Sequence, residues 1–142
     1  MASFSFFDQF KENLGKGVHN FTSDSTCTVT VALCAAANAP VSSNSVLADL
    51  TEVAYTNLSS RVFSNVSFEQ TSGTAKLLAD DLVLTASGGA VATFRYVVIY
   101  DDDPTSPANP LIGFYDHGIN VTLADTQTYT IDLGSNGFAT LT

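Results

Sequence analysis

The stretch Asp81–Gly118, DLVLTASGGAVATFRYVVIYDDDPTSPANPLIGFYDHG, decides the fold. Two apolar runs flank Ser87-Gly88-Gly89, and paired glycines supply the positive φ angles that tight hairpin turns need. We therefore predict that a strand at 76–86 forms a hairpin with a strand at 92–100. The second run is the most hydrophobic in the chain, which predicts a central strand. Arg95 lies inside it, so this side chain needs either a carboxylate partner or a position at an edge.

Outside this stretch the chain shows the two-residue period of β-strands. TCTVTVAL at 26–33 alternates threonine with apolar residues, and 61–70 alternates so that apolar residues fall on both faces. Residues 35–45 predict a loop, and 46–55 predict either a helical turn or an irregular edge segment. Four shorter strands are expected at 111–115, 120–123, 128–133 and 138–141, with hairpin turns at 124–126 and 134–137. Seven or eight short strands predict an antiparallel β-sandwich or a jelly-roll-like barrel.

The N-terminal segment is the exception to the β pattern. Phe4, Phe7, Phe10 and Leu14 recur at near-helical spacing, which predicts one short amphipathic helix ended by Gly15 and Gly17. We divide the chain into an N-terminal helix or arm, 1–20, and a β-sandwich domain, 21–142. The helix either packs over the sheet or docks on a neighbouring subunit. For the second case the candidate contact residues are Phe4, Phe6, Phe7 and Phe10.

Charge narrows the possible partners. The 142 residues carry a formal net charge of -9, and no lysine or arginine follows Arg95, whereas six aspartates do. Nucleic acid and anionic membranes are therefore disfavoured as partners, because both need clustered cations. No apolar run has the length of a membrane span, and the first residues lack the basic start of a signal peptide.

The two cysteines, Cys27 and Cys34, are expected to be free thiols. Seven residues of strand would hold them about 23 Å apart and on opposite faces, too far for a disulfide. Free thiols are typical of a protein made in a reducing compartment.

The densest group of potential ligands is Asp101-Asp102-Asp103, with Asp116 and His117 further along. A hard cation needs several oxygen ligands that converge, whereas consecutive side chains diverge. We therefore favour a solvated turn before Pro104 over a metal site, and keep Asp101, Asp102 and Asp103 as the metal alternative.

The sequence predicts no cofactor, no catalytic residues and no enzyme. His19 and His117 belong to no metal-binding pattern, and no Gly-x-Ser-x-Gly sequence accompanies the many serines. We expect both histidines to be turn residues that cap backbone groups. A pair of catalytic carboxylates and a carbohydrate platform of exposed aromatic residues are weaker alternatives, because core packing explains most of the aromatic positions.

Exposed strand edges are the remaining feature. Edges are normally guarded by lysine, proline or bulges, yet the chain has only three lysines. Subunits that cover one another's edges would make such strands tolerable, so the sequence predicts a homo-oligomer, a dimer or a trimer.

Several of these segments also resemble a known family. FDQF…LGKGVHNF, the TVTVAL strand, VLADLTE, TSGTAKLLADDLVLTASGGAVATFRYVVIY and NPLIGFYDHG…VTLADTQTYTIDL are similar to small virion proteins of tailed bacteriophages. The resemblance covers nearly the whole chain, and its most specific part is 82–100 joined to 111–118. These are structural motifs, so no active-site residues come with them.

The resemblance implies a virion protein made in the bacterial host cytoplasm. Within a virion we expect a capsid decoration, or cement, protein that binds across junctions between copies of the major capsid protein. The alternatives are a tail or head–tail component and, from a different class, a carbohydrate-binding module for host recognition.

Overall fold

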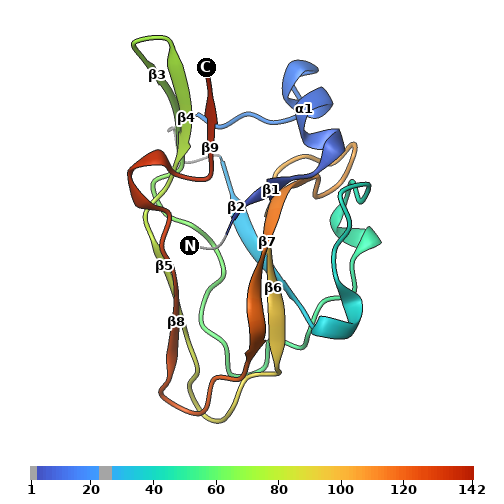
Figure 1. Ribbon diagram of the computed structural model, residues 1–142, viewed down its shortest axis with the longest axis vertical. Coiled ribbons are helices and arrows are strands. Elements are labelled where there is room, and N and C mark those ends of the chain that lie inside the picture. The colour runs from blue at the N-terminus through green and yellow to red at the C-terminus, as the bar shows by residue number, and fades with distance from the viewer. Residues whose placement is uncertain (1–2, 23–26) are drawn as a thin grey trace.

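The computed structural model describes residues 3–22 and 27–142 (Figure 1). Its strands are β1 (Ser5–Phe6), β2 (Val29–Cys34), β3 (Ser67–Thr71), β4 (Thr74–Leu78), β5 (Leu82–Thr85), β6 (Phe94–Asp101), β7 (Leu111–Val121), β8 (Thr128–Ile131) and β9 (Ala139–Leu141). Its helices are α1 (Asp8–Gly15) and three short 3₁₀ turns, η1 (Ala36–Asn38), η2 (Leu47–Asp49) and η3 (Gly134–Asn136). The fold class is mainly β with one N-terminal α-helix, as the sequence predicted.

The strands form two layers. The central sheet has the order β1-β7-β6-β2 and is antiparallel throughout. The opposite layer is divided into a three-stranded sheet, β3-β4-β9, and a two-stranded sheet, β5-β8, and we call these two sheets together the split layer. In Figure 1 the split layer runs along the left side and the central sheet faces it. The arrangement is sandwich-like.

The predicted hairpin between 76–86 and 92–100 is wrong. The first segment is interrupted, so that β4 ends at Leu78 and β5 begins at Leu82. β5 and β6 lie in different sheets, because β5 pairs with β8 whereas β6 pairs with β2 and β7. The glycines do adopt the expected positive φ, 86° at Gly88 and 152° at Gly89, but their turn carries the chain from one layer to the other.

The turns at 124–126 and 134–137 also join strands that do not pair with each other. β7 and β8 lie in opposite layers, and β9 pairs with β4 rather than with β8. The tight hairpin of the described residues is β3–β4, whose two turn residues, Ser72 and Gly73, have φ of 51° and 84°. Two successive positive φ angles match the twist of a two-residue hairpin. The strands expected at 111–115 and 120–123 are one strand, β7.

Apolar side chains from both layers meet in the main core. The central sheet contributes residues of β2, β6 and β7. The split layer contributes one or two residues each from β4, β5, β8 and β9. Fully buried members are Val29, Val31, Leu33, Phe94, Val97, Ile99, Ile112, Leu77, Leu84 and Ile131. The alternation predicted from the two-residue period therefore places these residues between the layers.

The outer face of the central sheet is covered as well. Ala32, Cys34, Val98 and Leu111 point away from the main core and are fully buried beneath Phe7 and the segment around η2. The cover explains why 97–100 reads as a continuous apolar run, since a strand buried on both faces does not alternate.

The N-terminal helix begins later than predicted. Phe4 and Phe6 precede it in extended backbone, because β1 pairs with β7 through Ser5–Phe114 and Phe6–Gly113. The predicted end is confirmed. The amide of Gly17 donates to Leu14 O and that of Val18 to Asn13 O, with φ of 72° at Gly17. These two bonds form a Schellman motif, which places glycine just after a helix.

The free side of β2 is covered by residues 53–63, which we call the edge strap. The predicted strand at 61–70 is regular only in β3, from Ser67, because the residues before it belong to this strap. Four hydrogen bonds of 2.9–3.0 Å join the edge strap to β2. The amides of Val31 and Leu33 donate to Arg61 O and Tyr55 Oη, and the carbonyls of Val29 and Leu33 accept from the amides of Phe63 and Val53. This edge of the central sheet is therefore protected within the chain. Among the described residues, no helix has the length and apolar character to cross a membrane.

Candidate functional site

The three consecutive aspartates do not converge. Asp101, at the end of β6, is 1% exposed and accepts a hydrogen bond from His19 Nδ1 at 2.8 Å. Asp102 and Asp103 are exposed, and the Asp103 carboxylate accepts the amide of Thr28. Burial, and then the neighbouring charge of Asp103, raises the pKa of Asp102. The predicted solvated turn is therefore correct for Asp102 and Asp103. It is wrong for Asp101, which is buried because it ends β6 and pairs with buried His19.

His19 is a buried residue and not the turn cap that the sequence predicted. Its ring lies between two phenylalanines, with centroids 5.2 Å from Phe10 and 5.2 Å from Phe21, and it stacks nearly parallel on Phe21. The pair with Asp101 ties the segment after α1 to the end of the central sheet. A buried carboxylate is costly unless it is paired, so the histidine stabilises the inward position of Asp101.

Within residues 3–22 and 27–142, His19 Nε2 has no hydrogen-bond partner, so no described hydroxyl is bonded to this pair as a catalytic triad requires. The buried hydroxyl of Thr30, on β2, also has no hydrogen-bond partner. Thr30 shares its face of β2 with Ala32 and Cys34, which lie beneath the outer cover, whereas the rings around His19 belong to the main core. The central sheet therefore separates the two groups.

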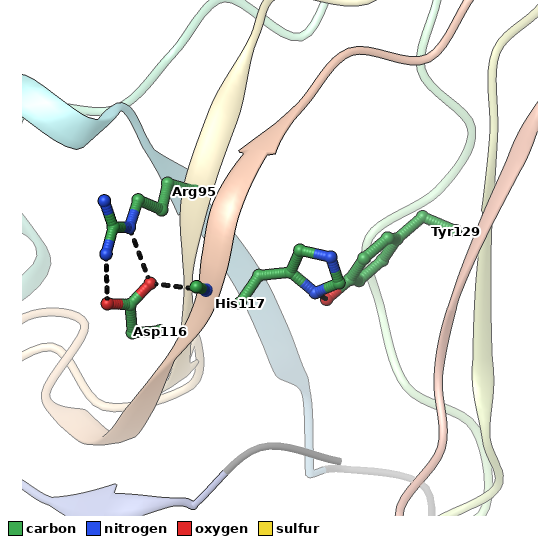
Figure 2. A network of polar contacts seen from close by, with 5 residues as sticks. Arg95, Asp116, His117 and Tyr129 are labelled. Carbon is green, nitrogen blue, oxygen red and sulfur yellow. Dashed lines mark hydrogen bonds and ion pairs between the residues drawn. The ribbon is translucent and has the colours of Figure 1, made fainter.

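Asp116 and His117 point to opposite sides of β7 (Figure 2). Asp116 accepts two hydrogen bonds from Arg95, 2.8 Å from Nε and 2.9 Å from Nη2, and a third from the amide of Gly118 at 2.7 Å. The bonds from Arg95, followed by that from Gly118, lower the pKa of Asp116. The expectation that Arg95 needs a carboxylate partner is confirmed.

His117 joins the two layers rather than capping a turn. Its Nδ1 lies 3.1 Å from Tyr129 Oη of β8 (Figure 2). Tyr129 Oη in turn lies 3.0 Å from Tyr115 Oη of β7. Burial, and then the hydrogen bond to Tyr129, raises the pKa of Tyr115. β7 bulges here, since Tyr96 of β6 pairs with Asp116 but Phe94 pairs with Val121. The bulge aims Asp116 and His117 at their separate partners.

A third polar cluster, around the edge strap, has no counterpart in the sequence predictions. The Arg61 guanidinium lies over the Tyr55 ring at 3.6 Å and donates to the carbonyl of Val31, and Tyr55 Oη donates to Glu52 at 2.5 Å. Burial, and then the bond to Glu52, raises the pKa of Tyr55. The sequence did contain a signal for this cluster. The chain has only two arginines, and an arginine within a strand-like segment needs a specific partner.

A groove lies beside the N-terminal segment. It has a volume of about 410 Å³ and is lined by Leu14, His19, Asn20, Phe21, Thr22, Ser67, Phe68 and Glu69. A second hollow, about 270 Å³, is lined by Val18, Asn20, Asp101, Asp103 and Pro104. Within residues 3–22 and 27–142, no three His, Cys, Asp or Glu side chains gather so that they could hold a metal ion.

The candidate contact residues are divided between core and rim. Phe7 and Phe10 are 0% and 3% exposed, so in this conformation they serve the chain's own core. Phe4 and Phe6 are half-buried against it, with the two rings edge-to-face at 5.5 Å. Contact with a neighbouring subunit stays a prediction for all four residues.

No disulfide joins Cys27 and Cys34, as predicted. Burial, and then the charge of Glu52, raises the pKa of Cys34 to about 11, so this thiol is neutral and unreactive at physiological pH.

No protein-family profile, curated protein or solved structure matches this chain. The resemblance to small virion proteins therefore stays a prediction.

Proposed function

We propose that this chain is a structural protein of a bacteriophage virion, in the role of a capsid decoration protein. It would bind across junctions between copies of the major capsid protein and oppose their separation. The segments that resemble small virion proteins, above all 82–100 with 111–118, support the proposal.

The observation that carries the proposal is the use of the buried and half-buried polar side chains as fasteners. His19–Asp101 secures the N-terminal segment, Arg95–Asp116 joins β6 to the bulge of β7, and Glu52–Tyr55–Arg61 holds the edge strap. The first pair joins residues 82 positions apart and the second joins residues 21 positions apart, while the third cluster ties its own segment to β2 through Val31 and Leu33. Such a distribution suits a protein that transmits load more than one that arranges groups around a substrate.

The surface offers means of contact with copies or partners. Within the described residues β3 and β9 each pair with β4 alone, and β8 pairs with β5 alone, so each has one side without a partner strand. Such edges are sites for strand addition. The net charge of -9 favours a partner surface rich in lysine and arginine.

The test uses purified particles. A decoration protein should be present in a fixed ratio to the major capsid protein, and particles that lack it should lose heat or salt stability and regain it when the full chain is added back. Recovery of the chain only with detached tails would reject the capsid role and favour a tail or head–tail component.

A carbohydrate-binding module is the second candidate, and the 410 Å³ groove favours it. The partly exposed ring of Phe68 lies there next to the polar side chains of Asn20, Ser67 and Glu69, a combination that can stack on and hydrogen-bond a sugar. A glycan array with the full chain decides between the two. Binding that Phe68→Ala abolishes and Val83→Ala, in the exposed part of β5, leaves unchanged would favour the sugar module.

A further inference from the structure

Residues 3–14 pack into both cores of the protein, and Gly15 and Gly17 join them to the rest of the chain. Phe7 enters the outer core of the central sheet, Phe10 enters the main core, and Phe6 stacks on Phe10 with centroids 5.3 Å apart. We propose that residues 3–14, which we call the arm, exchange between neighbouring copies, so that each arm completes the central sheet of another chain. This inference rests on the proposed function, because only a dense array brings arms and vacant sites together.

The acceptor site is built for this segment. β1 adds to the side of β7 at Gly113 and Phe114, and a side chain at Gly113 would collide with both the Phe4 ring, at 2.3 Å, and the carbonyl of Ser5, at 2.7 Å. Gly113 therefore leaves room for one particular occupant. A second copy carries the same arm and can make every one of these contacts, which is the basis of domain exchange.

Two further bonds fix the start of α1 on the body of the protein. Asp8 N–H donates to Ser42 O at 3.0 Å, and Ser42 Oγ donates to the Asp8 carboxylate at 3.2 Å. Both residues are exposed. They thus report on the docked arm without belonging to either core.

The hinge lies at Gly15–Gly17. A Cβ atom added at Gly15 or at Gly17 would meet nothing within 4 Å, so neither position is held by packing. Gly17 has φ of 72°, and its change to an extended conformation would redirect the arm away from its own chain. Glycine makes this change without steric strain, and its cost is the loss of the two Schellman bonds from the amides of Gly17 and Val18. The contacts of the arm with the central sheet and the two cores are the same before and after exchange.

Concentration decides which form prevails. A short flexible connection gives an effective concentration on the order of 1 mM for closure on the same chain. A dilute chain therefore keeps its own arm. Copies fixed side by side on a shell reach comparable local concentrations, and exchange then competes with closure.

The experiment mixes two chains with one added cysteine each, Asp8→Cys and Ser42→Cys. Both also carry Cys27→Ser, so that fully buried Cys34 is the remaining native thiol. The mixtures, from about 1 μM to about 1 mM, are oxidised, and the bond between position 8 of one chain and position 42 of the other is measured by peptide mass spectrometry. We expect its yield at the highest concentration to exceed at least tenfold that of a collision control, Asp8→Cys mixed with Ser135→Cys on η3.

The double variant Asp8→Cys/Ser42→Cys supplies the closed reference. Oxidised when dilute, it should form its disulfide within one chain, and this locked chain should then produce no exchanged dimer at high concentration. A yield in the mixture no higher than the collision control, together with intramolecular closure of the double variant at every concentration, would show that the arm does not exchange. That outcome would leave the decoration role standing, since particle binding is measured separately with the unmodified chain.

Discussion

The central sheet is covered on both faces, whereas the strands of the split layer have one side against the core and the other toward solvent. Every residue of β2 is buried, and so are the last five of β6, while β3 and β8 keep most of their residues exposed or half-exposed. The side chains explain this difference in burial. β2, VTVALC, carries apolar residues on both faces, whereas β3, SFEQT, alternates. The outer cover comes from segments that are not strands, Phe7 of the N-terminal segment and the residues around η2.

The comparison shows where the fold is tightly constrained. A sheet buried on both faces needs partners for its buried charges and a closed edge. The His19–Asp101 pair supplies the first at the end of β6, and the edge strap closes the free side of β2. The split layer tolerates more, except where its backbones come close together. The predictions below test both statements in order of expected size.

The largest effect is expected at the end of the central sheet. Asp101→Ala removes the partner of buried His19 and leaves the amide of Asp103 without its acceptor, so we expect the free energy of unfolding to fall by about 3–5 kcal/mol. Denaturant titration measures it. Asp102→Ala, next in the chain and exposed, is the matched control and should change the value by about 0.5 kcal/mol or less. Equal losses in the two variants would contradict the role assigned to the pair.

In the split layer the sensitive point is the close approach of two backbones. A Cβ at Gly137 would lie 2.1 Å from the carbonyl oxygen of Leu77, on β4, whereas a Cβ at Gly134 would meet nothing within 4 Å. The two glycines have nearly the same φ, 61° and 62°. Gly137 combines its φ with ψ of -147°, a region that is essentially restricted to glycine, so Gly137→Ala adds backbone strain to the clash and should cost about 1–3 kcal/mol more than Gly134→Ala in free energy of unfolding. Thermal and denaturant unfolding compare them, and equal stability would show that β9 is not held tightly on β4.

Alkaline pH should weaken the central sheet through Cys34. Its folded pKa of about 11 lies above that of an unfolded thiol, so the stabilisation is complete below about pH 8.5 and is lost as the pH rises toward 11. The size for this thiol is on the order of 2–3 kcal/mol. Urea titrations between pH 8 and 11 on the native chain and on Cys34→Val isolate this contribution, because the buried tyrosines titrate in both. Parallel curves for the two chains would rule it out.

The smallest effect is expected at the exposed clamp between β6 and β7. Arg95 and Asp116 are about one-third exposed, with side-chain exposures of 34% and 39%, so their ion pair is screened by solvent and by salt. Arg95→Ala should lower Tm only slightly. The lowered pKa of Asp116 means that the contribution is present at neutral pH and disappears as the pH falls below the carboxyl's ordinary value. A double-mutant cycle with Asp116→Ala, at low and high salt, measures it, and a large salt-independent coupling would contradict the screened geometry.

Local patterns predicted much of the secondary structure and little of the site. Period, composition and glycine chemistry predicted most of β2, the loop at 35–45, the end of α1 at Gly15–Gly17 and the positive φ of Gly88 and Gly89. The strand was expected at 26–33, of which residue 26 lies outside the described residues, and β2 is Val29–Cys34. The position of Arg95 within an apolar run predicted a carboxylate partner but did not identify Asp116 as that partner. The inward position of Asp101 had no local signal, since a run of three aspartates before proline reads as solvent-exposed until the ring of His19, 82 residues away, is placed beside the first of them.

The two-residue period and the apolar content were enough to specify a mainly β chain with a short N-terminal helix, because side chains alternate across a strand whatever that strand pairs with. The partners of the strands were decided only in three dimensions. Ser87-Gly88-Gly89 has the chemistry of a hairpin turn, yet β5 pairs with β8 and β6 with β7 and β2, since burial of both layers in one core outweighs the pairing of neighbours in sequence. Burial likewise places Phe7 and Phe10 in the cores of their own chain. The exchange experiment tests whether the arm of a second copy fills the same two positions.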